Sequence, residues 1–414
     1  MSQNVCIYFS DTGGGHRSAA EAVEAALQAV LAQSGNQGAV HLIKDTIAEK
    51  CHPINRLFAE TYNYLLRHKQ PLMKYYYWFL HVIRPERGLN TLLTRGYFDK
   101  LLMDHQPSVV VSVHPMQNHL LAAAVHRLGL HTKLIVVVTD PNADLWRSWA
   151  CPEVDLTIVP NDLVKNRLVQ FGLQEQRVMS LGMPVHPDFF SEPTMSRAKF
   201  LSHLGLATDA LTVCINAGWA GGGNMLKIYR ELSRVGRPLQ AIFLCGHNTD
   251  LYEQAMAAAA ESDVPTAVLP FHDCMSDLMA SVDLMVTKAG GLTTYQALAR
   301  RLPLVFDVIT QPMPQERGTI DMLVDHNLAG SVRQPEDIID IIELFEPQAD
   351  RLQSKLPSVY EFDLTDTGIF EIAKQILGYC APPIVLTDVS QSEAEVAPCD
   401  SQPKSTANQA AGET

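Results

Sequence analysis

The stretch from Val5 to Ala20 constrains the fold more than any other part of the sequence. It reads Val-Cys-Ile-Tyr-Phe-Ser-Asp-Thr-Gly-Gly-Gly-His-Arg-Ser-Ala-Ala, which is a short apolar run, a glycine turn and the start of an Ala-rich helical pattern. Glycines allow a sharp turn between a strand and a helix and leave room for a ligand at the helix start. Asp11 and His16 flank the turn, so we expect a carboxylate and an imidazole at a strand's carboxyl end, where open α/β sheets bind ligands. A plain turn with a capping Asp is the alternative.

Short apolar runs alternate with helical patterns along most of the chain, which predicts α/β domains with mainly parallel sheets. A length of 414 residues favours two such domains, each a doubly wound, Rossmann-like unit. We expect the first domain at residues 1–183, a proline-containing linker at 184–193 and the second domain at 194–380. The last helix of the second domain is expected to pack back on the first. Residues 381–414 contain no aromatic residue, so we expect a disordered tail.

Charge and composition exclude several classes of protein. The net charge of −13 argues against a nucleic-acid-binding protein, which needs a basic surface. No apolar stretch is long enough to span a bilayer, and the start of the chain does not resemble a signal peptide, so we expect a cytoplasmic protein, free or attached at a membrane surface. Neither C-x-x-C spacing nor an Asp-x-Asp at a strand end is present, so no metal or other cofactor is predicted.

Two further glycine-rich turns follow predicted strands in the second half. Residues 216–224 contain Gly218 and Gly221, and residues 287–296 contain Gly290 and Thr293. Backbone N–H groups in such turns, together with a helix start, favour a diphosphate, and Thr293 can cap the helix or bind a phosphate oxygen. Each turn also has a simpler interpretation as a flexible loop.

Residues 54–102 combine aromatic and basic side chains. Eight basic residues stand against three acidic ones in this segment, whereas the whole chain is acidic. Aromatic rings and cations together suit an anionic membrane surface. Packing of the aromatic residues on the N-terminal domain is the main alternative. The predicted membrane contacts are Lys74, Tyr75, Tyr76, Tyr77, Trp78 and Arg84.

The opening stretch closely resembles the N-terminal signature of the monogalactosyldiacylglycerol synthases and related diacylglycerol glucosyltransferases. These enzymes are similar to glycosyltransferase family 28, to which the enzyme that adds N-acetylglucosamine to lipid I belongs. The resemblance covers roughly residues 4–375, because further motifs agree in the expected order. They are Ser112-Val113-His114-Pro115-Met116-Gln117, Val138-Thr139-Asp140, Gly182-Met183-Pro184-Val185, Lys288-Ala289-Gly290-Gly291-Leu292-Thr293 and Gln315-Glu316-Arg317-Gly318.

The resemblance implies a two-domain glycosyltransferase of the GT-B arrangement. Its implied reaction moves a hexose from a UDP-hexose to diacylglycerol or a similar lipid, with inversion and without a metal. The implied catalytic residues are Asp11 and His16, and Gly14, Gly15 and His114 would line the acceptor cleft. The implied donor-binding residues are Gly218, Gly221, Gly290, Thr293, Gln296, Gln315 and Glu316.

The sequence departs from the family pattern at two donor positions. Trp219 stands in a loop that usually lacks a bulky residue, and Gln296 stands where a Glu usually binds the ribose. Two other functions therefore stay open. One is a nucleotide-sugar epimerase or hydrolase that acts on a soluble substrate, and the other is a non-catalytic protein that binds a sugar nucleotide or a lipid.

Overall fold

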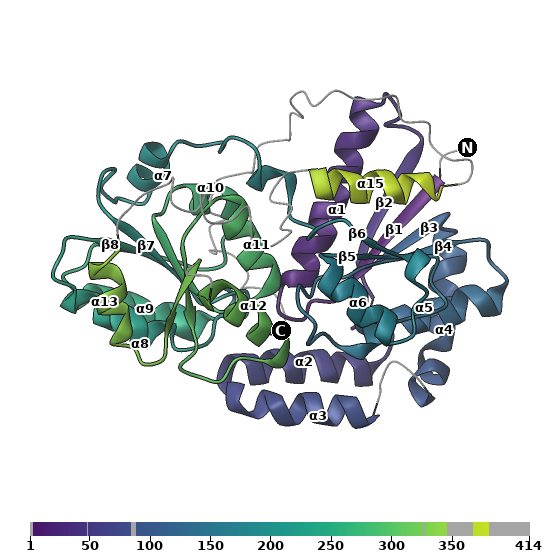
Figure 1. The fold of residues 1–414 in the computed structure, drawn as a ribbon, viewed down its shortest axis with the longest axis horizontal. Helices are drawn as coiled ribbons and strands as arrows, with labels where there is room; N and C mark the ends of the chain where they lie inside the picture. Colours follow the sequence, from purple (N-terminus) through teal and green to yellow (C-terminus); the bar gives the residue numbers. More distant parts are fainter. Residues whose placement is uncertain (1–2, 48, 84–87, 326–327, 346–366, 381–414) are drawn as a thin grey trace, which may run out of the picture.

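The computed structural model of the protein describes residues 3–47, 49–83, 88–325, 328–345 and 367–380 (Figure 1). Two six-stranded sheets, one in each half, form its framework, and every strand pairing in them is parallel. Helices connect successive strands and cover the sheets. The predicted fold class, two doubly wound α/β domains, is therefore confirmed.

The first sheet has the strand order β2-β1-β3-β4-β5-β6. Every residue of β3 and β5 is buried, as expected for strands that helices cover on both faces. The chain passes from β1 to β2 on one side and then returns to β3 on the other side, so the topological switch point lies between β1 and β3. The strands are β1 (Gln3–Phe9), β2 (Val40–Thr46), β3 (Val109–Ser112), β4 (Lys133–Val137), β5 (Leu156–Val159) and β6 (Val178–Ser180).

The helices of the first half follow from local signals. Gly13 and Gly14 both have positive φ, so the first helix begins only after them, at Gly15. Asn161 caps the helix after β5, because its side-chain oxygen accepts a bond from the Val164 N–H at 3.0 Å. In Figure 1, α2 and α3 lie at the bottom of the view. The helices are α1 (Gly15–Gln33), α2 (Pro53–His68), α3 (Met73–Ile83), α4 (Leu89–His105), α5 (Pro115–Leu128) and α6 (Asp162–Gln170).

The last described helix, α15 (Thr367–Gly378), lies on the first half although it follows the second sheet in the chain (Figure 1). It packs against α1, and its residues Ile369, Ile372 and Ile376 belong to the core that α1 forms with β1 and β3. The C-terminal segment therefore ties the two halves together. Residues 381–414, for which we expect a disordered tail, lie outside the described part of the chain.

The second sheet has the strand order β12-β11-β10-β7-β8-β9, so its switch point lies between β7 and β10. Its strands are β7 (Thr212–Asn216), β8 (Gln240–Leu244), β9 (Thr266–Leu269), β10 (Leu284–Thr287), β11 (Leu304–Asp307) and β12 (Ala329–Val332). Its α-helices are α7 (Arg197–His203), α8 (Met225–Glu231), α9 (Thr249–Ala260), α10 (Met275–Ala280), α11 (Gly291–Ala299), α12 (Pro314–Asp325) and α13 (Asp337–Glu343). The 3-10 turns within the described ranges are η1 (Gln70–Leu72), η2 (Arg147–Trp149), η3 (Glu175–Arg177), η4 (Pro187–Phe189) and η5 (Leu232–Arg234).

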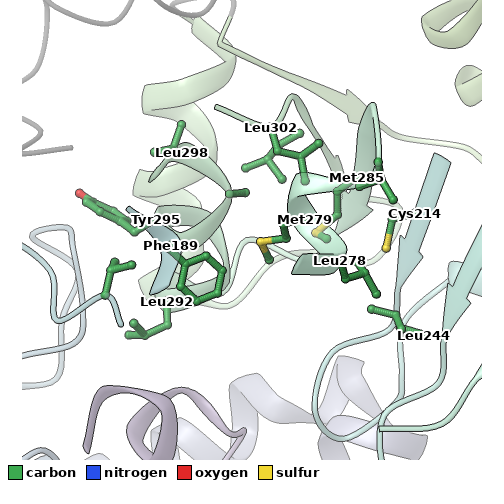
Figure 2. Packing of buried hydrophobic residues seen from close by; sticks show 14 of the residues in the cluster. Phe189, Cys214, Leu244, Leu278, Met279, Met285, Leu292, Tyr295, Leu298 and Leu302 are labelled. Atoms are coloured by element: carbon green, nitrogen blue, oxygen red, sulfur yellow. The ribbon is translucent and has the colours of Figure 1, made fainter. Parts of the chain in front are cut away.

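The segment that joins the two halves is packed into the second core. Phe189, at the end of η4, lies in one buried cluster with Leu292, Tyr295 and Leu298 of α11 (Figure 2). Burial of such side chains contributes about 1.5–3 kcal/mol each. The connection is therefore fixed directly beside α11, whose first residues face the other half.

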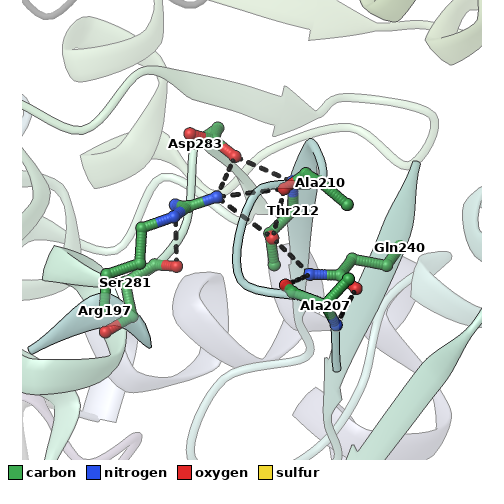
Figure 3. A network of polar contacts seen from close by, with 7 residues as sticks. All are labelled: Arg197, Ala207, Ala210, Thr212, Gln240, Ser281 and Asp283. Atoms are coloured by element: carbon green, nitrogen blue, oxygen red, sulfur yellow. Dashed lines mark hydrogen bonds and ion pairs between the residues drawn. The ribbon is translucent and has the colours of Figure 1, made fainter. Parts of the chain in front are cut away.

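A polar network joins the amino ends of three strands of the second sheet (Figure 3). One oxygen of Asp283 accepts bonds from Arg197 Nη2 and from the Thr212 N–H, each at 2.8 Å. Gln240 Nε2 donates to the carbonyl of Ala207 at 2.7 Å. Thr212, Gln240 and Asp283 stand at the amino ends of β7, β8 and β10, so this network is structural and leaves the carboxyl ends of the strands for a ligand.

None of the helices in the described ranges is both long enough and apolar enough to cross a bilayer.

Candidate active site

The loops that follow β1, β3, β7 and β10 meet between the two halves. These four strands flank the switch points of the two sheets, where doubly wound folds bind ligands. Two cavities open at this place, with volumes of about 1340 and 650 Å³. We call them the larger cavity and the smaller cavity. The larger lies beside α1 and the loops after β8 and β9, and the smaller lies beside α2, α3 and the loops after β3 and β10.

Trp219 lies at the boundary between the two cavities and lines both of them. Its side chain packs against the first glycine turn, because a Cβ placed on Gly14 would lie 2.6 Å from the Trp219 Cβ. On another side the indole meets the His247 ring at a centroid distance of 4.9 Å. The bulky residue that departs from the family pattern is thus the point at which the glycine turns of both halves touch.

His16, in the first turn of α1, and His114, at the end of β3, are brought together in the smaller cavity, with ring centroids 4.4 Å apart. His16 Nδ1 lies 2.7 Å from the Val113 carbonyl oxygen, which can only accept, so Nδ1 carries the proton and Nε2 is the acceptor. His114 Nδ1 accepts from the Met116 N–H at 3.3 Å, so its proton is on Nε2. Burial lowers the pKa of His16 to about 4 and holds the pKa of His114 well below its usual range. Both rings are therefore neutral at neutral pH.

Asp11, the other residue predicted to be catalytic, is placed differently. Arg17 Nε donates to its Oδ1 at 2.8 Å, and Arg17 Nη2 donates to its Oδ2 at 2.5 Å. Asp11 lines neither cavity, whereas His16 lines the smaller one. Both carboxylate oxygens of Asp11 are thus occupied by charge-assisted hydrogen bonds to Arg17. Of the two predicted catalytic residues, the fold presents only His16 to the cavity.

Asp140 lies in the smaller cavity although the sequence reasoning gave it no role. Trp149 Nε1 donates to its Oδ2 at 2.6 Å, and the Trp149 ring centroid lies 6.1 Å from that of His16. Burial raises the pKa of Asp140. Its position three residues beyond the end of the apolar β4 was the signal in the sequence, because acidic residues near the carboxyl ends of parallel strands face the ligand site.

In the glycine loop after β7, two backbone amides that were predicted to bind the sugar donor form hydrogen bonds within the protein. The Gly218 N–H donates to Asn216 Oδ1 at 2.9 Å, and the Gly221 N–H donates to the Gly218 carbonyl at 3.0 Å. A Cβ on Gly221 would lie 2.1 Å from the Cys245 carbonyl oxygen. Gly218 lines both cavities, but Gly221 lines neither. The expectation that these two amides face a diphosphate is therefore not met, and the glycine at 221 is explained by close backbone packing.

The amino end of α11 is better placed to bind an anion. Gly290, Gly291, Leu292 and Thr293 all line the smaller cavity. The first N–H groups of a helix have no partner within the helix and carry partial positive charge. Gln296 is one turn further on and lines the larger cavity, where its Nε2 donates to Ser18 Oγ of the other half at 2.9 Å. One helix, α11, thus places the predicted residues Gly290, Thr293 and Gln296 along the two cavities.

Two opposite charges, the half-buried Lys288 and the buried Glu316, also line the smaller cavity. Burial lowers the pKa of Lys288 and raises that of Glu316, and their mutual attraction opposes both shifts. Asp307 adds to the attraction on Lys288 and is itself held by Asn224, whose N–H donates to Asp307 Oδ2 at 2.9 Å. The side chain of Gln315, at the start of α12, is outside the described residues.

The predicted membrane contacts fall into three groups. Lys74, Tyr75 and Trp78 are exposed on α3, with Tyr75 at 60% and Trp78 at 67% of their full exposure. Tyr76 differs from the prediction, because it turns inward to line the smaller cavity and its hydroxyl donates to the Phe58 carbonyl at 2.9 Å. The side chain of Tyr77 and the whole of Arg84 lie outside the described residues.

Among the described residues, one group of His, Cys, Asp and Glu side chains is close enough to hold a metal ion. It consists of His119, Cys151 and Glu153, and none of the three lines either cavity.

Comparison with known proteins defines the class to which this fold and site belong. Residues 16–185 match the family model for monogalactosyldiacylglycerol (MGDG) synthase, and residues 224–316 match that for the glycosyltransferase family 28 C-terminal domain. The fold is that of Acinetobacter baumannii MurG, with a TM-score of 0.55 at 15% identity over 90% of this chain and 99% of MurG. UDP-GlcNAc 2-epimerase from Neisseria meningitidis, solved with UDP-GlcNAc, shares the fold with a TM-score of 0.56 at 12% identity, covering 91% and 99% of the two chains. The chain is a glycosyltransferase of this two-domain architecture.

Curated relatives identify the family. The chain is 30% identical to the probable monogalactosyldiacylglycerol synthase of Glycine max over 389 residues, which are 90% of this chain and 71% of the relative. It is 27% identical to monogalactosyldiacylglycerol synthase 1 of Arabidopsis thaliana over 85% of this chain and 66% of the relative. The chain therefore belongs to the monogalactosyldiacylglycerol synthase family, as its motifs predict.

Proposed function

We propose that the protein transfers a hexose from a UDP-hexose to diacylglycerol or a similar membrane lipid, with inversion at the anomeric carbon. One observation carries this proposal. His16, the start of α11 and the charged residues Lys288 and Glu316 line the same 650 Å³ cavity between the two halves. A base, an anion site and polar groups for a sugar thus surround one space large enough for the reacting parts of both substrates.

In the proposed donor complex, the nucleotide lies along α11. Gln296 would bind the ribose in the larger cavity, and the amides of residues 290–293 would bind the diphosphate. Lys288 adds positive charge beside that helix end, where charge develops as UDP leaves. Glu316, and Gln315 beside it in the chain, would bind hydroxyl groups of the hexose, because an amide and a carboxylate together offer donors and acceptors.

His16 is the proposed general base. The lipid hydroxyl oxygen attacks the anomeric carbon, the bond from that carbon to the diphosphate breaks, and the hydroxyl proton passes to His16 Nε2. The Val113 carbonyl holds the required tautomer by accepting from Nδ1 at 2.7 Å. The low pKa of His16 keeps the ring unprotonated at neutral pH. UDP leaves with the electron pair of the broken bond.

We further propose peripheral attachment to an anionic membrane through α2, α3 and α4. Large apolar side chains are exposed on all three helices, among them Leu57, Trp78 and Leu92 at 59%, 67% and 69%. Exposed cations accompany them, including Lys74 and Arg95. Aromatic residues insert at the bilayer interface, and each basic residue near an anionic surface adds about 1 kcal/mol.

We also propose that transfer needs no metal ion. Lys288 and the start of α11 supply positive charge at the position proposed for the diphosphate. Excess EDTA should therefore leave the rate of transfer unchanged.

The test incubates the protein with UDP-galactose or UDP-glucose and vesicles that contain diacylglycerol and an anionic phospholipid, and then separates the lipids. We expect a glycosylated lipid. His16→Ala should lower the rate by about a hundredfold or more, as expected for a general base. The matched control is His131→Ala, since His131 is exposed and lines neither cavity. Soluble sugar products without glycolipid would contradict the proposal and favour an epimerase or hydrolase.

A further inference from the structure

Helix α3 is apolar on two opposite sides. Tyr75, Trp78 and Phe79 are exposed, at 60%, 67% and 42% of their full exposure. Met73 and Leu80 are both only 2% exposed and lie on the inner side. A helix that is apolar on all sides is normally buried on all sides. The exposed apolar side of α3 is therefore expected to be buried against a further apolar phase, such as the proposed membrane. The inner side already faces the interior of the site.

The inner side of α3 and the facing side of α2 form one wall of the smaller cavity. Its apolar members are Phe58, Ala59, Leu66 and Leu80, with the rings of Tyr62 and Tyr76. Asn55 is the further member from these two helices, and no described residue of α2 or α3 brings a charged group to the cavity. The wall is thus suited to an apolar ligand.

The other parts of the same cavity are polar and charged. His16, Asp140, Lys288 and Glu316 line it on the side of the strand ends. A sugar diphosphate fits this polar side, because a charged group beside an apolar wall loses its hydration without compensation. The cavity is therefore amphipathic, with a reactive polar side and an apolar side under α3.

The second half of the protein closes the apolar side. Arg67 Nε at the end of α2 donates to the Ala220 carbonyl at 2.8 Å, and Leu66 and Met73 pack with Ala220 and Met313 in one buried cluster. The helix pair thus contacts the loop after β7 directly. A ligand under α3 would be enclosed between the proposed membrane surface and the second half.

We propose that this apolar wall binds one acyl chain of the acceptor lipid. The chain passes from the bilayer around α3 and lies between α2 and α3, and the attached hydroxyl group reaches His16. The inference rests on the proposed function and adds the place and the chemical class of the bound part. Diacylglycerol matches the cavity because its free hydroxyl group is only a few bonds from its acyl chains. The polar side and the apolar side of the cavity adjoin in the same way.

Filling the wall tests the inference. Ala59 is buried, at 8% exposure, and lines the cavity, so Ala59→Leu adds bulk where the chain would lie. We expect the ratio of kcat/KM for a long-chain diacylglycerol to that for a short-chain, water-soluble one to fall about tenfold or more. Ala257→Leu on the exposed part of α9 makes the same change far from the cavity and should keep the wild-type ratio. UDP binding and the thermal midpoint of each variant are measured to check that it folds.

A measurement on the unchanged protein keeps the inference testable if Ala59→Leu does not fold. Diacylglycerol with a diazirine at the end of one chain is incorporated into vesicles, irradiated with the protein and mapped by peptide mass spectrometry. Labels on residues 53–80 that long-chain diacylglycerol competes away support the inference. An unchanged acceptor ratio in folded Ala59→Leu, or labels only on other segments, would overturn it. Either result leaves the proposed transfer standing, whereas absence of glycolipid in the wild type contradicts the proposed function itself.

Discussion

Replacing Gly14 by Ala should destabilise the contact between the two halves of the protein, because the structure leaves no room for a side chain at this position. Gly14 is the N-cap of α1 and has φ of 81°, a left-handed conformation that costs an L-residue about 1–2 kcal/mol. The added Cβ would also lie 2.6 Å from Trp219 Cβ and Cγ, which adds about 1–3 kcal/mol for overpacking. The expected destabilisation is the sum of these two costs, about 2–5 kcal/mol.

Gly15→Ala is the matched control. A Cβ at Gly15 meets nothing within 4 Å, and the residue is the first of α1, where Ala is the better helix former by about 1 kcal/mol. Thermal unfolding followed by circular dichroism should show a lower midpoint for Gly14→Ala and an unchanged or higher midpoint for Gly15→Ala. Affinity for UDP, measured by calorimetry, should fall in Gly14→Ala, because Gly14 lies where both halves meet.

A second substitution at Trp219 distinguishes the steric cost from the backbone cost. Trp219→Gly removes the clashing atoms and should recover the steric part in a double-mutant cycle with Gly14→Ala. Trp219→Ala retains the Cβ at 2.6 Å and should recover much less. If Gly14→Ala and Gly15→Ala unfold at the same midpoint, the contact between Gly14 and Trp219 does not exist and the reasoning is refuted.

Three further predictions concern the site. When log kcat/KM is plotted against pH, its acid limb should have a midpoint near pH 4, because burial lowers the pKa of His16 to about 4. The unprotonated, basic form of His16 is lost only as the pH falls through that value. A midpoint near pH 6.5 would exclude His16 as the base. Gln296→Glu should tighten UDP binding about fivefold in calorimetry, because a charged acceptor forms hydrogen bonds roughly twice as strong as those of a neutral one. Weaker binding would show that Gln296 does not contact the ribose. Asn224→Ala should lower the free energy of unfolding by about 1–3 kcal/mol in denaturant titrations, because the buried Asp307 carboxylate loses the hydrogen bonds that the Asn224 side chain donates. An unchanged free energy of unfolding would contradict this role of Asn224.

The sequence predicted the alternation of strands and helices because most strands are short apolar runs bounded by glycine or polar residues, and such local patterns do not depend on distant parts of the chain. The short strands β6 and β12 were not predicted. It also predicted that functional residues follow β1, β3 and β10, because the carboxyl ends of parallel strands share one edge. His16, His114 and Thr293 lie there as expected. The boundaries of the three helices α2, α3 and α4 were not predicted from the sequence.

The details of the site were not predictable from local pattern. Asp11 and His16 flank the same turn, yet only the folded backbone decides that Arg17 binds the first and that the second opens into the cavity. Likewise, the glycine at 221 reads as part of a phosphate loop, but the approach of the Cys245 carbonyl explains it.

The sequence by itself determined the alternation of strands and helices, the glycine turns and the family, since these rest on residues close together in the chain. The tertiary structure decided which side chains share a cavity, that Tyr76 faces inward, and that Trp219 meets Gly14 although the two are far apart in sequence. The physical reason is that burial, close contact and pKa shifts depend on neighbours in space, and some neighbours of α2 and α3 belong to the second half.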